Sequence, residues 1–140
     1  HSLELECKEV VLSLCKSPYA MSKDLDIHEE QSESMKSGVI FKSIFEVETD
    51  NIVHFAKRMK NFEDQGEQIK VAYHLPIKLH VFDDHTVMFS MINQVNPEQN
   101  LTYMVIKHSD LAETLITTFY KYWNDAITVD KFLDKENIKL

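Results

Sequence analysis

Short runs of branched and aromatic residues alternate along this chain with stretches of helical periodicity. Residues 9–14 form an apolar run that ends at Ser17-Pro18, and residues 39–47 form a second run rich in valine, isoleucine and phenylalanine. Runs of this length next to turn-forming residues are typical of buried strands. We therefore predict the first two strands of a sheet at these positions.

Two segments of the first half have the pattern of helices. Residues 21–36 are mostly polar with a thin apolar stripe, and they end before Gly38, which can supply the left-handed turn after a helix. The second predicted helix is capped by Thr49 or Asp50 and ends before Gly66. Its apolar residues recur at helical spacing and are Ile52, Phe55, Ala56, Met59 and Phe62.

The middle of the chain alternates apolar and polar residues, as strands with one face against a core do. Residues 69–75 predict one strand, which Pro76 interrupts because proline has no amide hydrogen for the ladder. Residues 77–81 resume the alternation. We predict a hairpin centred on Asp84 that continues into a strand at residues 86–92.

The last third of the chain predicts a loop, a strand and a helix. The loop covers residues 96–100, the strand covers residues 101–106, and Ser109 or Asp110 caps the helix. The helix has a broad apolar face made of Leu111, Leu115, Ile116, Phe119, Tyr122 and Trp123. We expect this face to pack on the sheet, and we expect the charged tail 129–140 to form no more than one loose turn of helix.

The order of these elements and the length of the chain predict one α/β domain over residues 1–140, a mixed β-sheet flanked by α-helices. The chain begins at His1-Ser2 without an initiator methionine. We expect residues 1–2 to be a tag remnant and an upstream domain to be missing.

Charge and composition limit the possible partners. The formal net charge of −8 opposes nonspecific binding to nucleic acid, so we expect the chain not to hold DNA by itself. The sequence shows neither a secretory signal nor an apolar run long enough to cross a membrane, and we expect a cytoplasmic protein without a membrane partner. Cys7 and Cys15 lack the close spacing of metal or redox motifs, and we expect reduced thiols.

Residues 76–83 have the spacing of the phospholipase D signature HxKxxxxD, with Pro76 in place of the histidine. Lys78 and Asp83 occupy the other two positions, and Ser90 and Asn93 lie at the distance of that family's later serine and asparagine. In such enzymes the histidine is the nucleophile and the lysine stabilises phosphate charge. Proline can do neither. The resemblance therefore implies a phospholipase-D-like fold without this chemistry, and we predict no catalytic residue.

Residues 71–87 also resemble the matching segment of TrmB-like bacterial transcription regulators. In those proteins a phospholipase-D-like sensor domain follows an N-terminal winged helix or accompanies a LuxR-type helix-turn-helix. The resemblance implies an effector-sensing and dimerisation domain, which would reach DNA only through a domain absent from this chain. Single-motif phospholipase-D-like proteins pair across a two-fold axis that brings the motif strands together, so the resemblance also implies a homodimer.

Five residues are candidates for binding an unidentified small-molecule effector, namely Lys78, His80, Asp83, Ser90 and Asn93. The alternative for Lys78 and Asp83 is an exposed strand lysine and a turn aspartate. We predict neither a cofactor nor a metal. The histidines His74, His80 and His85 crowd one hairpin, but a proline separates the first two, and nothing in the pattern makes the three converge.

Two other functions stay open at this point. The chain could be a divergent phosphodiesterase or nuclease that uses His80 or His85 as a substitute nucleophile, or it could be a purely structural dimerisation module. The aromatic residues Phe119, Tyr120, Tyr122 and Trp123 have helical spacing, which favours core packing or a dimer surface over a ligand pocket.

Overall fold

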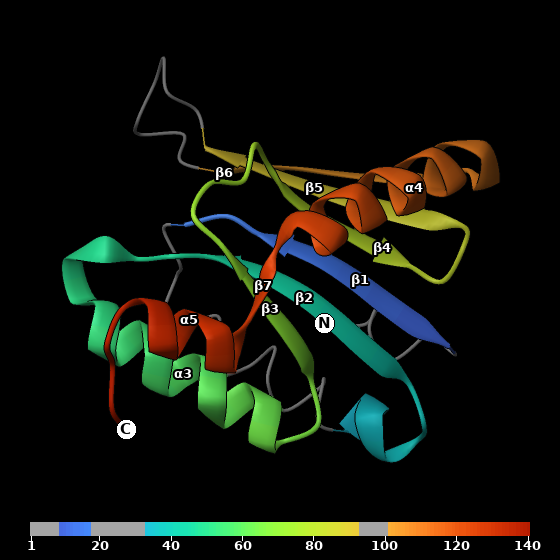
Figure 1. The fold of residues 1–140 in the computed structure, drawn as a ribbon. Coiled ribbons are helices and arrows are strands. Elements are labelled where there is room, and N and C mark those ends of the chain that lie inside the picture. Colours follow the sequence, from blue (N-terminus) through green and yellow to red (C-terminus); the bar gives the residue numbers. More distant parts are fainter. Residues whose placement is uncertain (1–8, 18–32, 93–100) are drawn as a thin grey trace.

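The computed structural model describes residues 9–17, 33–92 and 101–140 (Figure 1). Within these residues, seven strands form one mixed sheet in the order β6-β5-β4-β1-β2-β3-β7. The strands are β1 (Val10–Cys15), β2 (Ile40–Glu46), β3 (Gln68–Ala72), β4 (Lys78–Phe82), β5 (Thr86–Ile92), β6 (Leu101–Lys107) and β7 (Ile127–Thr128). The helical elements that lie wholly within the described residues are a short 3-10 helix η1 (Thr49–Asn51) and the helices α3 (Ile52–Asp64), α4 (Ser109–Asp125) and α5 (Val129–Lys135). The predicted mixed sheet flanked by helices is confirmed.

The directions of the strands place the motif segment at one edge of the sheet. Strands β1, β2 and β3 are parallel, while β4 runs antiparallel to β1. The carboxyl end of β1 therefore lies beside the beginning of β4, with Leu14 opposite Leu79. Pro76 comes just before β4, so it lies at the edge where the parallel strands end.

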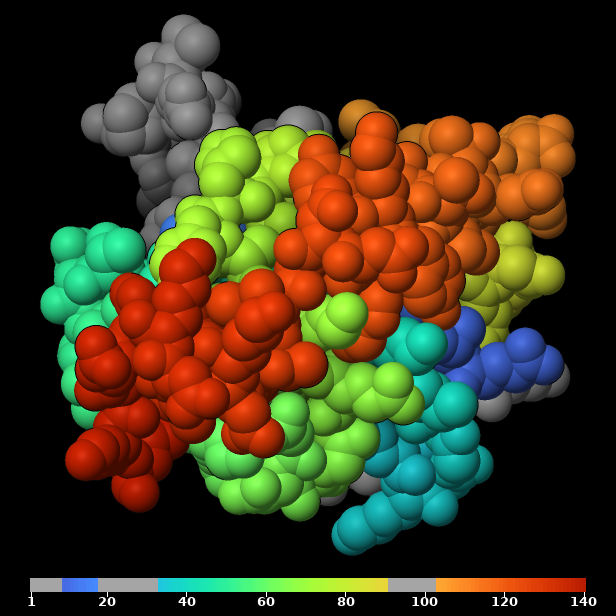
Figure 2. Space-filling view, viewed as in Figure 1, coloured from blue at the N-terminus to red at the C-terminus, as the bar shows by residue number. Residues whose placement is uncertain are grey.

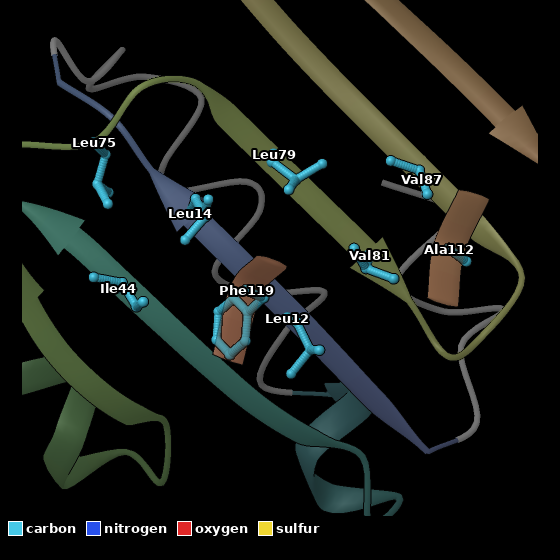
Figure 3. Packing of buried hydrophobic residues seen from close by; sticks show 9 residues of the cluster. All are labelled: Leu12, Leu14, Ile44, Leu75, Leu79, Val81, Val87, Ala112 and Phe119. Carbon is cyan, nitrogen blue, oxygen red and sulfur yellow. The ribbon is translucent and has the colours of Figure 1, made fainter. Parts of the chain in front are cut away.

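Helix α4 covers one face of the sheet (Figure 1). Phe119 from α4 is fully buried over the central strands and stacks on Trp123 at a ring-centroid distance of 5.6 Å. Figure 3 shows the cluster that it completes, which consists of Leu12, Leu14, Ile44, Leu75, Leu79, Val81, Val87, Ala112 and Phe119. Phe119 thus belongs to the core, and Tyr120, Tyr122 and Trp123 are partly buried against it, in keeping with the core packing that their spacing favoured.

Helices α3 and α5 pack on the opposite face, against β3. The chain crosses from α4 to this face through the two residues of β7, which pairs with β3 at the sheet edge. Phe132 of α5 is fully buried and meets Phe55 of α3 edge to face, with ring centroids 5.7 Å apart. Figure 2 shows α5 in red directly against α3 in green. The prediction of a loose tail at residues 129–140 is therefore wrong, because Val129 and Phe132 anchor a helix in the core.

Several predicted boundaries also change. The strand predicted over residues 69–75 ends at Ala72. Thr49 and Asp50 do not cap a helix but lie inside η1, and α3 begins at Ile52 without a side-chain cap. His108 caps α4 in place of the predicted Ser109 or Asp110, since its ring accepts a hydrogen bond from an amide of the first turn.

Other predictions fall partly outside the described residues. Of the helix predicted at 21–36, only residues 33–36 are described, and these are helical. Cys7 and the loop at 96–100 lie outside the described residues.

Gly38 and Gly66 both have positive φ, at 94° and 108°, as expected of residues that end helices. None of the helices in the described parts of the chain is both long and apolar enough to cross a membrane.

Candidate functional site

The first motif position, Pro76, is exposed in the connection between β3 and β4. The residue before it, Leu75, is fully buried in the core under α4. This packing fixes the backbone that enters the motif strand. The scaffold therefore presents position 76 at the carboxyl edge of the parallel strands, where ligands commonly bind in sheets of this kind, but the side chain there has no polar atom.

Lys78 and Ser90 lie directly opposite each other on the antiparallel strands β4 and β5. Residues that oppose each other in a ladder point to the same face of the sheet. Lys78 is half-buried and Ser90 is buried. Two of the predicted site residues are therefore brought together, and they supply a cation and a hydroxyl on one face.

His80 lies on the same face as Lys78, two residues farther along β4, which is about 7 Å in an extended strand. It opposes Ser13 of the central strand β1, and the Ser13 hydroxyl lies 2.8 Å from its Nδ1. Burial, with a smaller contribution from the Lys78 charge, lowers the pKa of His80 to about 4. The imidazole is therefore neutral near pH 7, and it lies on the side of Lys78 away from position 76.

Asp83 lies beyond the other end of β4, about 16 Å along the chain from Lys78. Its Oδ1 accepts hydrogen bonds from the amides of Glu9 and Val10, at 2.9 and 3.0 Å. Its own amide donates to the carbonyl of Val10 at 2.8 Å, and its φ of 53° is left-handed. This carboxylate joins the β4–β5 turn to the start of β1, so the structure does not bring it together with Lys78.

Glu46, at the end of β2, forms a buried polar centre beside the motif. Its carboxylate accepts hydrogen bonds from the Leu75 amide at 2.6 Å, the Ser17 hydroxyl at 2.5 Å and Lys16 at 3.3 Å. Lys16 also donates to the Leu75 carbonyl at 2.7 Å. Burial raises the pKa of Glu46, but these hydrogen bonds and the Lys16 charge outweigh burial and hold the pKa below its ordinary value.

The Glu46 centre was not predicted from the sequence. The available signal was a carboxylate within the apolar run 39–47, at the end of a predicted strand, where a buried acid requires partners. Ser17 and Lys16 follow the first predicted strand and would reach the same edge if the two strands are parallel. The Glu46 centre therefore holds the ends of β1 and β2 and the chain entering Pro76 in one arrangement.

The three histidines of the hairpin do not converge. His74 is exposed near Glu46, with its Nδ1 3.8 Å from a carboxylate oxygen, whereas His85 is exposed beyond the opposite end of β4. The Nδ1 atom of His85 lies 2.7 Å from the Thr86 hydroxyl, and its Nε2 atom lies 3.6 Å from a carboxylate oxygen of Asp83. Within residues 9–17, 33–92 and 101–140, no group of three or more metal-binding side chains is placed to hold an ion. The fifth predicted site residue, Asn93, lies outside the described residues.

Solved structures share this architecture. The chain superposes on the phospholipase D family member Nuc from Salmonella typhimurium with a TM-score of 0.73 and 19% identity, covering 91% of this chain and 86% of that one. NucT from Helicobacter pylori gives a TM-score of 0.66 and 15% identity over 91% and 86% of the two chains. The chain has the phospholipase-D-like fold.

A third match is TrmBL2, an archaeal chromatin protein whose structure shows a novel mode of DNA binding. Its TM-score is 0.71 at 14% identity, over 91% of this chain. This chain spans about half of TrmBL2, since the match covers 48% of that protein. No protein-family model and no curated protein matches the sequence. At these identities the likeness shows a shared fold.

Proposed function

We propose that this chain is the phospholipase-D-like domain of a transcription regulator, which senses an effector, dimerises and carries out no phosphodiester chemistry. The observation that carries the proposal is Pro76 at the position of the nucleophile, on a scaffold that otherwise keeps the fold. The likeness to TrmBL2, a DNA-binding protein that contains a domain of this shape, supports the regulatory role.

The geometry of the histidines argues against a substitute nucleophile. A group that attacks phosphorus must reach the substrate held by the lysine and must have an accessible lone pair. His80 has one ring nitrogen at the Ser13 hydroxyl and lies deeper in the sheet than Lys78. His85 is separated from Lys78 by the length of β4. Neither imidazole occupies the place of the ring that Pro76 replaces.

Lys78 and Ser90 are the residues that we propose to contact the effector. A lysine and a hydroxyl side by side are suited to an anionic oxygen, such as that of a phosphate or carboxylate. His80 would add a neutral imidazole to the same face. Asn93 follows β5 and stays a candidate, whereas Asp83 is occupied by the backbone of β1 and is assigned a structural role.

A hydrolysis assay tests the absence of chemistry. The protein, its His80→Ala variant and its His85→Ala variant are incubated with bis(p-nitrophenyl) phosphate and with single-stranded DNA, with Nuc as the positive control. We expect the rates of all three to equal the buffer background. A rate above background that His80→Ala or His85→Ala abolishes would show that the chain is a divergent phosphodiesterase.

A thermal-shift screen tests effector binding. Because a ligand that binds only the folded state raises the melting temperature by mass action, phosphorylated metabolites, carboxylates and neutral sugars are compared at equal concentration. We expect an anionic compound to stabilise the protein and Lys78→Ala to remove the effect. Lys57→Ala, at an exposed position on α3, is the matched control and should leave the shift unchanged. Equal melting temperatures with every compound would favour a purely structural module.

The regulatory role and the homodimer have direct tests as well. Sequencing the coding region on both sides of this segment should reveal a winged helix or a LuxR-type helix-turn-helix. Its absence from the full-length protein would overturn the regulator assignment. Sedimentation velocity over a range of concentrations measures the oligomeric state, for which we expect a homodimer.

A further inference from the structure

Two lysines contact the carboxyl end of α4 on the face of the sheet that this helix covers (Figure 1). Lys42 of β2 donates to the Tyr120 hydroxyl at 3.3 Å, and Lys70 of β3 donates to the Trp123 carbonyl at 3.0 Å. Lys70 lies opposite Ile44, the residue that follows Lys42 on the same face of β2. The two lysine side chains are therefore neighbours on adjacent strands.

The indole ring of Trp123 holds both ammonium groups. The Nζ atoms of Lys42 and Lys70 lie 5.8 and 4.8 Å from the ring centroid, within the range of cation–π attraction. Phe119 stacks on the same indole from the core and fixes the position of the ring. Both lysines, Tyr120 and Trp123 are half-buried. Two cations are thus held close together, partly withdrawn from water and still open to a ligand.

Neither ammonium group has a carboxylate partner within 4 Å in the part of the chain that the structure describes. Two other half-buried lysines do, since Lys16 lies 3.3 Å from Glu46 and Lys60 lies 3.2 Å from its nearer carboxylate. Charges withdrawn from water are ordinarily paired, and this chain has 23 acidic but only 15 basic residues. Lys70 offsets the negative end of α4, but no comparable contact among the described residues explains Lys42.

We propose that Lys42 and Lys70 bind the phosphate group of a small phosphorylated molecule. Such a group has three acceptor oxygens and about two negative charges. An ammonium group has three donors, and each of these lysines uses one at α4, so both can donate charge-assisted hydrogen bonds to one phosphate. The Tyr120 hydroxyl accepts from Lys42, which leaves its own hydrogen for a further phosphate oxygen.

The charge of the whole chain favours a small ligand over a polyanion. The formal net charge of −8 repels nucleic acid, whose phosphates would extend far beyond two lysines. A compact anion in contact with both ammonium groups is attracted at short range, whereas salt screens charges beyond about 10 Å. We therefore expect a phosphorylated small molecule to bind here and DNA not to bind.

This site is separate from the proposed effector site. Leu79 packs in the core under α4, so Lys78, its neighbour on β4, points to the opposite face of the sheet. Lys42 and Lys70 lie on the α4 face, together with Ile44. The inference therefore goes beyond the proposed function and does not depend on it.

The fluorescence of Trp123 tests the site directly, because this residue is the only tryptophan among the 140 residues. Inorganic phosphate and glycerol 3-phosphate are titrated into the full chain at pH 8 and constant ionic strength. We expect a saturable change in emission, which sodium chloride at equal ionic strength should not produce. Both compounds carry the phosphate group, and the lower dissociation constant identifies whether free phosphate or an ester is preferred.

Lys42→Gln and Lys70→Gln should each raise the dissociation constant by about tenfold or more, because each removes a charge-assisted hydrogen bond. Lys42→Arg and Lys70→Arg keep the charge and should largely retain binding. Lys57→Gln, at an exposed position on α3, is the matched control and should bind like the wild type. Circular dichroism shows that the variants are folded. Calorimetry in the Lys78→Ala background measures the same dissociation constants without using the indole.

Three results would overturn the proposal. The first is an emission change that is the same with both phosphates and with sodium chloride. The second is a dissociation constant that stays unchanged in folded Lys42→Gln and Lys70→Gln. The third is loss of binding in Lys78→Ala alone, which would assign the phosphate to the proposed effector site and leave the proposed function intact. Phosphate binding that persists in Lys78→Ala and is lost in Lys42→Gln supports a second, separate site.

Discussion

The hydroxyl of Ser13 lies 2.8 Å from Nδ1 of His80, across the antiparallel pair of β1 and β4. Ser13 is buried in the central strand, and its hydroxyl gives the imidazole a hydrogen-bonding partner. The arrangement requires a neutral ring, because burial and Lys78 both disfavour the imidazolium. The stability of the fold is therefore linked to the protonation of one histidine.

We predict that His80 makes the protein less stable as the pH falls from about 6.5 to 4. An unfolded histidine has a pKa of about 6.5, whereas the folded pKa is about 4, so in this window the unfolded state binds a proton that the folded state does not. The loss should approach roughly 3 kcal/mol at the low end. Urea unfolding at several pH values measures it. In His80→Gln this component should vanish, and equal pH profiles for the two proteins would contradict the prediction.

Glu46→Gln should destabilise the protein at neutral pH by about 1–3 kcal/mol. The amide has one acceptor oxygen, and it directs a donor toward the amide of Leu75, the hydroxyl of Ser17 or Lys16. Because the pKa of Glu46 lies below its ordinary 4.5, the carboxylate contributes fully above that value and its contribution disappears as the pH falls through the lower, folded pKa.

Chemical denaturation at pH 7 measures the effect of Glu46→Gln. The matched control is Glu63→Gln, which removes one of the two carboxylate partners of Lys60, a surface ion pair with an N–O distance of 3.2 Å. Such pairs contribute little, so this variant should unfold almost like the wild type. Similar losses in the free energy of unfolding for the two variants would show that the Glu46 centre stabilises the protein no more than a surface ion pair does.

Asp83→Ala should cost about 2–3 kcal/mol, since it leaves the amides of Glu9 and Val10 without their acceptor and places alanine at a positive φ. Asp83→Asn should cost much less, because asparagine keeps an acceptor oxygen and tolerates the left-handed region. The difference in the free energy of unfolding between the two variants is the measurement. If Asp83→Ala is as stable as Asp83→Asn but abolishes effector binding, the carboxylate belongs to the binding site after all.

Phe132→Ala should destabilise the protein by about 3–5 kcal/mol, the range for a large side chain removed from a packed core. Phe132 is fully buried between α3 and β3, although it belongs to a tail that is charged in sequence. Leu140→Ala is the control, because that side chain is 56% exposed and its loss should change stability by less than about 0.5 kcal/mol. Equal melting temperatures for the two variants would show that α5 is dispensable.

The sequence was sufficient to predict most strands and the main helices, because branched residues and turn formers separate them clearly. The tail was misread because its two buried residues, Val129 and Phe132, are scattered among charges, and their burial depends on Phe55, which is far away in the chain. The cap of α4 was misplaced because histidine is not among the usual capping residues, and His108 acts as one through its ring nitrogen.

Site residues were harder to predict than elements. The approach of Ser90 to Lys78 follows from the predicted hairpin, so that pair could be anticipated. The structural role of Asp83 could not, because its partners are more than seventy residues away and no local pattern connects them. The same holds for Glu46, whose carboxylate links strands and a loop from three separate parts of the chain.

The central position of β1 has a consequence for how the protein acquires its shape. During synthesis β1 emerges before its two neighbours, and its partner β4 lies about seventy residues later in the chain. A nascent chain can therefore pair β1 with β2 but leaves the other edge of this apolar strand unpaired until β4 has left the ribosome. Proteins dominated by such distant pairings fold slowly, so we expect this domain to depend on chaperones more than a helical bundle of equal length.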